Sequence, residues 1–238
     1  MRRFSAAITA ENGRGSVAVI PDMKRVSPKE GELMRGRNPV EAAKLLAGCG
    51  APVLSVVTEK KHFGGSLELC GDIAKNAGVP VLRKDFITTE EELKKTADIG
   101  AAAVLLICAL TDGDTLAALY GKALELGLEP LVEVCTAGEM QLAKKLGARL
   151  VGVNNRDIRR LEKDGGGPSR TFDLAPGLPE GAILISESGI LSPGDVALAL
   201  SAGANAVLVG TALWTAHDMA AAYRSLRLEM PKRGVSTV

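Results

Sequence analysis

The stretch 80–107, "PVLRKDFITTEEELKKTADIGAAAVLLI", contains the unit on which the fold prediction rests. A short apolar run at 80–83 is followed by a helical pattern that starts near Thr88 and ends at Gly100. A second apolar run follows at 103–107. A strand, a helix and another strand in this order predict a βαβ unit with parallel strands.

The same alternation continues along the whole chain. Thr88 is the candidate N-cap of the helical pattern described above, and further helical patterns start after the candidate N-caps Asn38, Thr136 and Ser192. The strands are predicted at 17–22, 53–57, 80–83, 103–107, 130–134, 150–153, 182–186 and 206–210.

Eight strand–helix units can form either an open doubly wound sheet or a closed barrel. The chain of 238 residues has the usual size of a barrel, and "PDMKRVSP" (21–28) lacks the GxGxxG fingerprint that an open sheet favours. The glycine-rich loop at 164–169 is too short to separate two domains. We therefore predict an α/β fold, a single-domain (β/α)8 TIM barrel over 1–238, with 1–16 as an N-terminal extension.

The composition excludes several classes of protein. A formal net charge of +1 without a basic block, and 3% aromatic residues, argue against a nucleic-acid partner. No apolar run is long enough to cross a membrane and no signal peptide is apparent, so we expect a cytoplasmic protein. The two histidines are isolated, so no metal site is expected. Four scattered cysteines are interpreted as reduced and buried, namely Cys49, Cys70, Cys108 and Cys135.

Polar residues stand where the predicted strands end. A barrel brings these ends onto one rim, where the active sites of such enzymes lie. In the fifth strand Leu131 and Glu133 share one face, so Glu133 points inward if Leu131 does, and it could exchange protons near the two lysines. A structural ion pair is the alternative. The rim residues are Asp22, Lys24, Lys84, Glu133, Asn154, Asn155, Arg156, Asp157, Glu187 and Ser188.

The last two strands carry a second pattern. Barrels often bind phosphate with the loops after strands seven and eight, where small residues let backbone N–H groups approach the anion. Ser188, Gly189, Gly210 and Thr211 fit this role, although two ordinary turns would look similar. The loop 25–39 after the first strand is either a mobile lid or a plain surface loop.

Eight segments follow one another along the chain: "DMKRVSP" (22–28), "TEKKHFGGS" (58–66), "PVLRKDFI" (80–87), "AVLLI" (103–107), "LVEV" (131–134), "VGVNNRD" (151–157), "SESGI" (186–190) and "VLVGTALW" (207–214). The most specific in combination are "VLRKDFI", "NNRD" and "SESGI". In this order the segments resemble the indole-3-glycerol-phosphate synthase family of tryptophan biosynthesis.

The resemblance implies a carboxy-lyase that closes the ring of phosphorylated 1-(2-carboxyphenylamino)-1-deoxyribulose with loss of CO₂ and water. It implies no metal and no organic cofactor. Lys84 would protonate the ketose carbonyl, Lys24 would hold the substrate carboxylate, and Glu133 would assist the dehydration. Asn154 and Ser188 would orient these groups and the sugar hydroxyls.

The resemblance also implies the binding residues. Arg156 and Glu187 would support the pocket, and Ser27, Gly189, Gly210 and Thr211 would bind phosphate. The aromatic ring of the substrate would contact Phe63, Phe86 and Leu105. We expect a monomer or weak homodimer.

The sequence departs from the family pattern at two points. Asp22 stands where the family usually has Glu, so the carboxylate is one methylene shorter. The family usually carries a helical extension over the barrel mouth, whereas 16 residues precede the first strand here and leave room for one helix of it.

Two other functions stay open at this point. A phosphoribosylanthranilate isomerase would carry a catalytic Cys at the end of strand one, where this chain has Asp22 and Lys24, and an aldolase would use Lys84 in a Schiff base. A related barrel that binds phosphate ligands with altered specificity or low activity is the second alternative.

Overall fold

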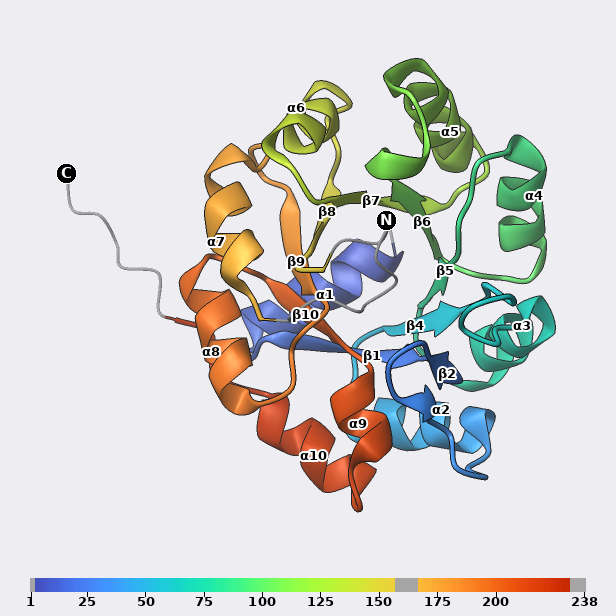
Figure 1. Cartoon of the computed structure of the whole chain (residues 1–238), viewed down its shortest axis with the longest axis vertical. Coiled ribbons are helices and arrows are strands. Elements are labelled where there is room, and N and C mark those ends of the chain that lie inside the picture. Colours follow the sequence, from blue (N-terminus) through green and yellow to red (C-terminus); the bar gives the residue numbers. More distant parts are fainter. Residues whose placement is uncertain (1–2, 157–166, 232–238) are drawn as a thin grey trace.

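Eight parallel strands form a closed barrel in the computed structural model, which describes residues 3–156 and 167–231 (Figure 1). This confirms the predicted (β/α)8 TIM barrel and its single domain. The barrel strands, in the order in which they are hydrogen-bonded, are β1 (Ala18–Met23), β10 (Ala206–Val209), β9 (Ile183–Glu187), β8 (Leu150–Asn154), β7 (Glu129–Val134), β6 (Ala103–Ile107), β5 (Val81–Lys84) and β4 (Leu54–Val57).

Helices surround the barrel on its outside, as Figure 1 shows. Asn38, Thr136 and Ser192 cap helices as predicted, but Thr88 does not, because the side chain of Thr89 accepts the N–H of Glu92. The helices are α1 (Arg3–Gly13), α2 (Pro39–Gly48), α3 (Leu67–Asn76), α4 (Glu90–Asp98), α5 (Gly113–Glu125), α6 (Ala137–Lys145), α7 (Ser169–Leu174), α8 (Pro193–Ser201), α9 (Thr211–Thr215) and α10 (Met219–Leu226).

The strands alternate between two apolar cores. Leu131 belongs to the core inside the barrel, while Val132 and Val134 belong to the larger core between barrel and helices. Glu133 therefore faces inward at the top of this inner core, as predicted. The same alternation in β5 puts Leu82 inside and sends Arg83 toward the helices, so that Lys84 again turns inward.

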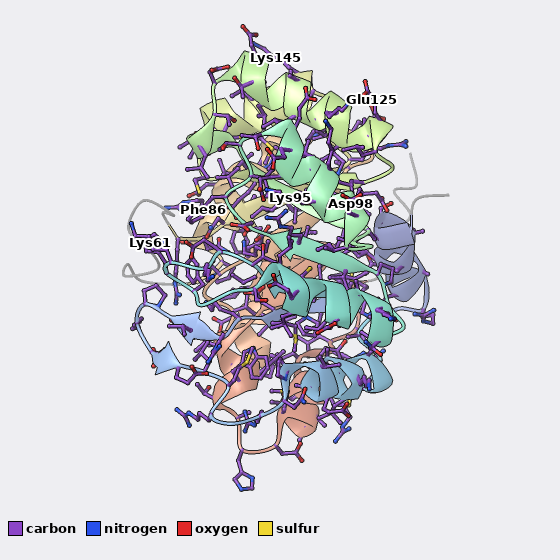
Figure 2. The ribbon with its side chains drawn as sticks, turned by 90° about the vertical axis from the view of Figure 1, so that its right-hand side faces the viewer. Lys61, Phe86, Lys95, Asp98, Glu125 and Lys145 are labelled. Carbon is purple, nitrogen blue, oxygen red and sulfur yellow. The ribbon has the colours of Figure 1, made fainter. Side chains whose placement is uncertain are left out.

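Helix α1 closes the end of the barrel opposite to the strand carboxyl ends. Phe4 and Ile8 are fully buried in the inner core, and the backbone N–H of Phe4 donates to Glu129, the first residue of β7, at 2.6 Å. In Figure 2, Phe86 and Lys61 lie at one end of the molecule and the violet ribbon of α1 at the other. The residues before β1 thus form one helix, and it lies at the end of the barrel opposite to the mouth that carries the charged cluster. Phe4 and Ile8 lie one helical turn apart on the same face of α1, so this helix can act as a plug, meaning that it fills the end of the inner core with apolar side chains.

The loop after β1 contains a small antiparallel hairpin, β2 (Val26–Ser27) and β3 (Gly31–Glu32). Leu33 and Met34 behind it are buried, and the N–H of Val26 donates to the carbonyl of Phe63 at 3.1 Å. The hairpin is therefore tied to the loop after β4. Its closure on a substrate stays a prediction.

Other predictions meet the structure in part. The four cysteines are free, yet only Cys70 and Cys108 are buried, whereas Cys49 and Cys135 are half-buried. Asp157 and residues 164–166 of the loop 164–169 lie outside the described residues. Within the described ranges, no helix is both long and apolar enough to cross a membrane, and no cluster of His, Cys, Asp and Glu could hold a metal ion.

Candidate active site

Lys84 is the centre of the charged cluster at the rim. It is the last residue of β5, and its Nζ donates to Glu133 Oε2 at 3.2 Å and to Glu187 Oε2 at 3.1 Å. The two carboxylate side chains are 0% exposed, whereas that of Lys84 is 21% exposed and reaches the cavity. Burial alone would lower the pKa of Lys84, but the charges of Glu187, Glu133 and Asp22 raise it above its ordinary value.

Asn154 and Asp22 complete the cluster from two other strands. The amide of Asn154 donates to Glu133 Oε1 at 3.1 Å, so both oxygens of that carboxylate are hydrogen-bonded. Asp22 Oδ1 accepts the hydroxyl of Ser55 at 2.7 Å, and its backbone carbonyl accepts the indole N–H of Trp214 at 2.8 Å. These bonds fix the geometry around Lys84 before any ligand arrives.

An aromatic wall stands on one side of the cavity. Phe63 and Phe86 meet edge to face, with ring centroids 6.5 Å apart, and Lys24 Nζ lies 5.7 Å from the centroid of Phe63. Phe63 is 6% exposed, so its ring is largely buried although it lies in a loop next to Gly64 and Gly65. The cavity is lined by Asp22, Lys24, Val57, Glu59, Phe63, Lys84, Asp85, Phe86, Leu105, Ile107, Asn154, Arg156 and Ser188.

A polar cavity adjoins this wall on the side of β9 and β10. Its lining includes Lys24, Lys84 and Arg156 as well as four residues of the predicted phosphate loops, Ser188, Gly189, Gly210 and Thr211. Ser27 lies in a neighbouring cavity that shares Arg156 and Thr211 with it. Ser188 has a φ of +66°, a left-handed conformation that bends the chain after β9.

The polar cavity has the properties of an anion site. Three cationic side chains reach it, and Arg156 Nε is buried without a hydrogen-bond partner among the described residues. A buried donor that lacks a partner favours a ligand with acceptor oxygens.

The fifteen residues to which the resemblance gives a catalytic or binding role thus belong to one connected region of the described structure. Thirteen of the fifteen line one of the three cavities, and Glu133 and Glu187 lie beneath them against Lys84.

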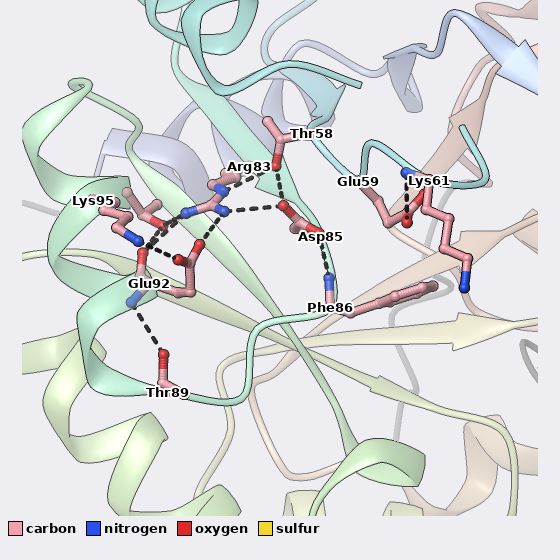
Figure 3. A network of polar contacts seen from close by, with 10 residues as sticks. Thr58, Glu59, Lys61, Arg83, Asp85, Phe86, Thr89, Glu92 and Lys95 are labelled. Carbon is pink, nitrogen blue, oxygen red and sulfur yellow. Dashed lines mark hydrogen bonds and ion pairs between the residues drawn. The ribbon is translucent and has the colours of Figure 1, made fainter. Parts of the chain in front are cut away.

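Arg83 holds the outer side of the same strand end. Its guanidinium donates to Thr58 Oγ1 at 2.9 Å, to Asp85 Oδ2 at 3.0 Å and to Glu92 Oε2 at 2.5 Å (Figure 3). Asp85 Oδ1 in turn accepts the N–H of Phe86 at 2.8 Å. The Arg83 clamp, meaning Arg83 with Thr58, Asp85 and Glu92, therefore fixes the backbone on both sides of the loop that follows Lys84.

We expect Arg83→Lys to lower the free energy of unfolding by roughly 1–3 kcal/mol, because an ammonium group cannot replace a planar fork with five donors. Turnover should fall as well, since Lys84 and Phe86 flank the loosened Asp85. Denaturant unfolding and steady-state kinetics measure the two effects. The exposed Arg149 offers the matched control, and Arg149→Lys should change neither. Equal behaviour of the two variants would contradict the role of the clamp.

Glu59 and Gly152 were not named as site residues from the sequence, and Asn155 was named only as a rim residue without a role. Glu59 accepts the N–H of Phe63 at 3.0 Å and so fixes the aromatic loop. The amide of Asn155 donates to the carbonyls of Glu187 at 2.9 Å and Ser188 at 3.3 Å, which holds the bend after β9. Gly152 leaves room for Glu187, as described below. All three residues lie inside the motifs at 58–66 and 151–157, but nothing in these motifs indicates which contacts they make.

The geometry defines a class of protein, a barrel enzyme with a lysine–carboxylate cluster beside an anion-binding cavity. A sequence profile of the family described as indole-3-glycerol phosphate synthase matches residues 1–226. The chain belongs to this family of tryptophan-biosynthesis lyases.

Relatives in archaea and bacteria agree with the profile. The chain is 44% identical over 202 residues to the indole-3-glycerol phosphate synthase of Pyrococcus furiosus, covering 85% of this chain and 88% of the relative. It is 44% identical over 200 residues to that of Pyrococcus abyssi, covering 84% and 86%. For Listeria monocytogenes the identity is 42% over 213 residues, covering 90% and 83%.

Proposed function

We propose that the protein is an indole-3-glycerol phosphate synthase that converts 1-(2-carboxyphenylamino)-1-deoxyribulose 5-phosphate to indole-3-glycerol phosphate, CO₂ and water. The observation that carries the proposal is the contact of Lys84 with Glu133 and Glu187 at the rim of a cavity that is apolar on one side and cationic on the other. Such a cavity matches a substrate with an aromatic ring at one end and a phosphate at the other.

Lys84 acts as the general acid of ring closure. Attack by the ring carbon on the ketose carbonyl interrupts aromaticity, so the oxygen that gains charge must be protonated as the bond forms. The ammonium group reaches the cavity from below, between two carboxylates that orient it. Glu133, held by Asn154, then assists the proton transfers of the dehydration.

Lys24 binds the substrate carboxylate until CO₂ leaves. Its position over the ring of Phe63 places a cation beside the aromatic wall, where the carboxyphenyl ring would contact Phe63, Phe86 and Leu105. Arg156, Ser27 and the backbone of Gly189, Gly210 and Thr211 bind the phosphate, while Ser188 orients the sugar hydroxyls. Because the substrate is bound at both its aromatic ring and its phosphate, the two carbons that react are held close together.

A turnover assay tests the proposal. The purified protein should convert the carboxyphenylamino-deoxyribulose phosphate to a fluorescent indole product. Tight binding of the substrate in calorimetry without any turnover would contradict it and support the alternative, a phosphate-ligand-binding barrel with altered specificity. Trapping by borohydride of a ketose phosphate on Lys84 would instead indicate a Schiff-base enzyme.

Asp22→Glu should lower turnover by roughly 10- to 100-fold, although the family usually has Glu here. Ser55 fixes the shorter carboxylate at 2.7 Å, and one more methylene moves it by about 1 Å or more toward the cavity. Steady-state kinetics of wild type and variant measure this. Ser55→Ala tests the cause, since it removes this hydrogen bond without lengthening the side chain of Asp22 and should lower turnover less. A faster Asp22→Glu enzyme would show that the shorter acid is a defect.

The chain should be a monomer or weak homodimer in solution and act in the cytoplasm. Light scattering coupled to size-exclusion chromatography measures the mass, and a stable tetramer would contradict the first expectation.

A further inference from the structure

Glu187 occupies a notch that exists because its neighbour on β8 is a glycine. A Cβ atom built on Gly152 would lie 2.0 Å from Glu187 Oε1 and 3.0 Å from its Cδ. Both distances are far below van der Waals contact, so any other residue at 152 displaces the carboxyl group. While Oε2 accepts from Lys84, Oε1 is buried without a hydrogen-bond partner among the described residues.

The surroundings of this carboxyl group are apolar below and anionic beside it. Leu131 Cδ1 lies 3.5 Å from the Cβ atom built on Gly152, and Leu208 on β10 is the register partner of Glu187. The charged groups that face it are Lys84 from β5, Glu133 from β7 and Asp22 from β1. On β8, its register partner is the uncharged Asn154.

The charge of Lys84 therefore opposes the charges of Glu133 and Asp22 around Glu187. An ionised carboxylate with one oxygen turned into an apolar core is costly, and a proton on it removes most of that cost. Burial, against the opposing charge of Lys84 and with the help of Glu133, raises the pKa of Glu187 to about 7. The buried position of Glu187 and the carboxylates near it thus both favour its neutral, protonated form.

We propose that Gly152 is a positioning residue whose notch holds Glu187 as a neutral carboxylic acid, and that this acid resupplies Lys84 with a proton during the reaction. The first half concerns the free protein. The second half rests on the proposed function. It makes Glu187 a proton store in direct contact with the general acid, at 3.1 Å.

The proton balance of the reaction requires such a store. Lys84 gives one proton to the carbonyl oxygen as the carbon–carbon bond forms, and the resulting hydroxyl group takes a second proton to leave as water. One proton returns when the indole double bond forms, and the ionised substrate carboxylate leaves as CO₂ with its bonding electrons left on the ring. Each turnover therefore consumes one proton. It moves from the Glu187 carboxyl group to the neutral amine of Lys84, and Glu187 regains it from water after product release.

Infrared spectroscopy of the protein without substrate tests the first half. The carbonyl stretch of a protonated, buried carboxyl group should be present at pH 6, weaken as the pH rises through about 7, and be missing in Glu187→Gln. Identical spectra of wild type and Glu187→Gln at pH 6 would overturn the proposal. This readout needs no activity, so it stands even if the turnover assay fails.

The pH profile of kcat/KM tests the second half, because it reports the groups of the free enzyme. Glu187 must be protonated to act, so kcat/KM should fall as the pH rises through about 7, and this limb should be missing in Glu187→Gln. Gly152→Ala should lower kcat by about 100-fold with little change in KM, since the carboxyl group moves by 1 Å or more. If Gly152 had a purely structural role, Gly152→Ala would leave the fall of kcat/KM with rising pH unchanged.

Gly121→Ala is the matched control for Gly152→Ala. Gly121 lies inside α5, and a Cβ added there meets nothing within 4 Å. It should keep the activity, the infrared band and the pH profile of the wild type. If Gly152→Ala does not fold, the two Glu187→Gln measurements still decide the proposal. An infrared band at pH 6 together with no turnover by the wild type would overturn the proposed function and the proton-store role, but not the notch.

Discussion

Lys84→Met should lower kcat by at least about 1,000-fold, since it removes the general acid and the cation nearest to the reacting carbonyl. The side chain is of similar length, so the cavity keeps its shape. The free energy of unfolding should also fall, because Glu133 and Glu187 lose a partner while fully buried. Fluorescence of the indole product measures the first effect and denaturant unfolding the second.

Lys122→Met provides the control for this variant. Lys122 lies on α5 and pairs with Glu125 at the surface, a type of ion pair that contributes about 1 kcal/mol or less. Its replacement should leave turnover unchanged. If Lys84→Met kept more than a tenth of the wild-type kcat, the general acid would have to be another group, and Lys24 would be the first candidate.

Phe4→Ala should lower the free energy of unfolding by roughly 3–5 kcal/mol, a large share of the total stability of an ordinary domain. Phe4 is 0% exposed and fills the inner core at the end that α1 closes. Removing its ring leaves a cavity there and gives water a path to the apolar interior. Denaturant unfolding of both proteins measures the difference. Below the unfolding transition kcat should stay near the wild-type value, since the charged cluster lies at the other end.

Phe172→Ala is the control for Phe4→Ala, because it makes the same substitution at an exposed position. Phe172 lies on α7 and is 42% exposed, so its truncation should cost less than about 1 kcal/mol. Similar losses in the two variants would mean that α1 does not act as a plug. A large loss of kcat in the folded Phe4→Ala protein would indicate that packing around α1 affects the geometry of the active site through the barrel strands.

Much of the barrel was predictable because its signals are local. The apolar runs matched the eight strands closely, since a parallel strand buried on both faces is apolar throughout. The alternation predicted that Glu133 shares the face of Leu131, and the place of Leu131 in the inner core then turns both side chains inward. The cap at Thr89 was placed one residue early, because "TT" offers two equivalent hydroxyl groups and only the backbone angles choose between them.

The rest depends on contacts between strands, which no local pattern records. Gly152 and Glu187 are far apart in the chain, and a glycine in a strand gave no sign of what fills its place. The place of α1 also depends on a contact with a distant strand, because the N–H of Phe4 donates to Glu129 at the start of β7. The hairpin at Val26–Ser27 and Gly31–Glu32 has strands too short for periodicity to detect.

The Arg83 clamp also limits how this protein can be redesigned. Glu92 is a residue of α4 on the outside of the molecule, where surface residues are usually exchanged freely to improve solubility or to graft a new binding face. Here its carboxylate anchors the guanidinium that fixes Asp85. Chimeras that combine β5 of one barrel with α4 of another should therefore carry Arg83 and Glu92 together, as one inherited unit, to keep Lys84 aligned.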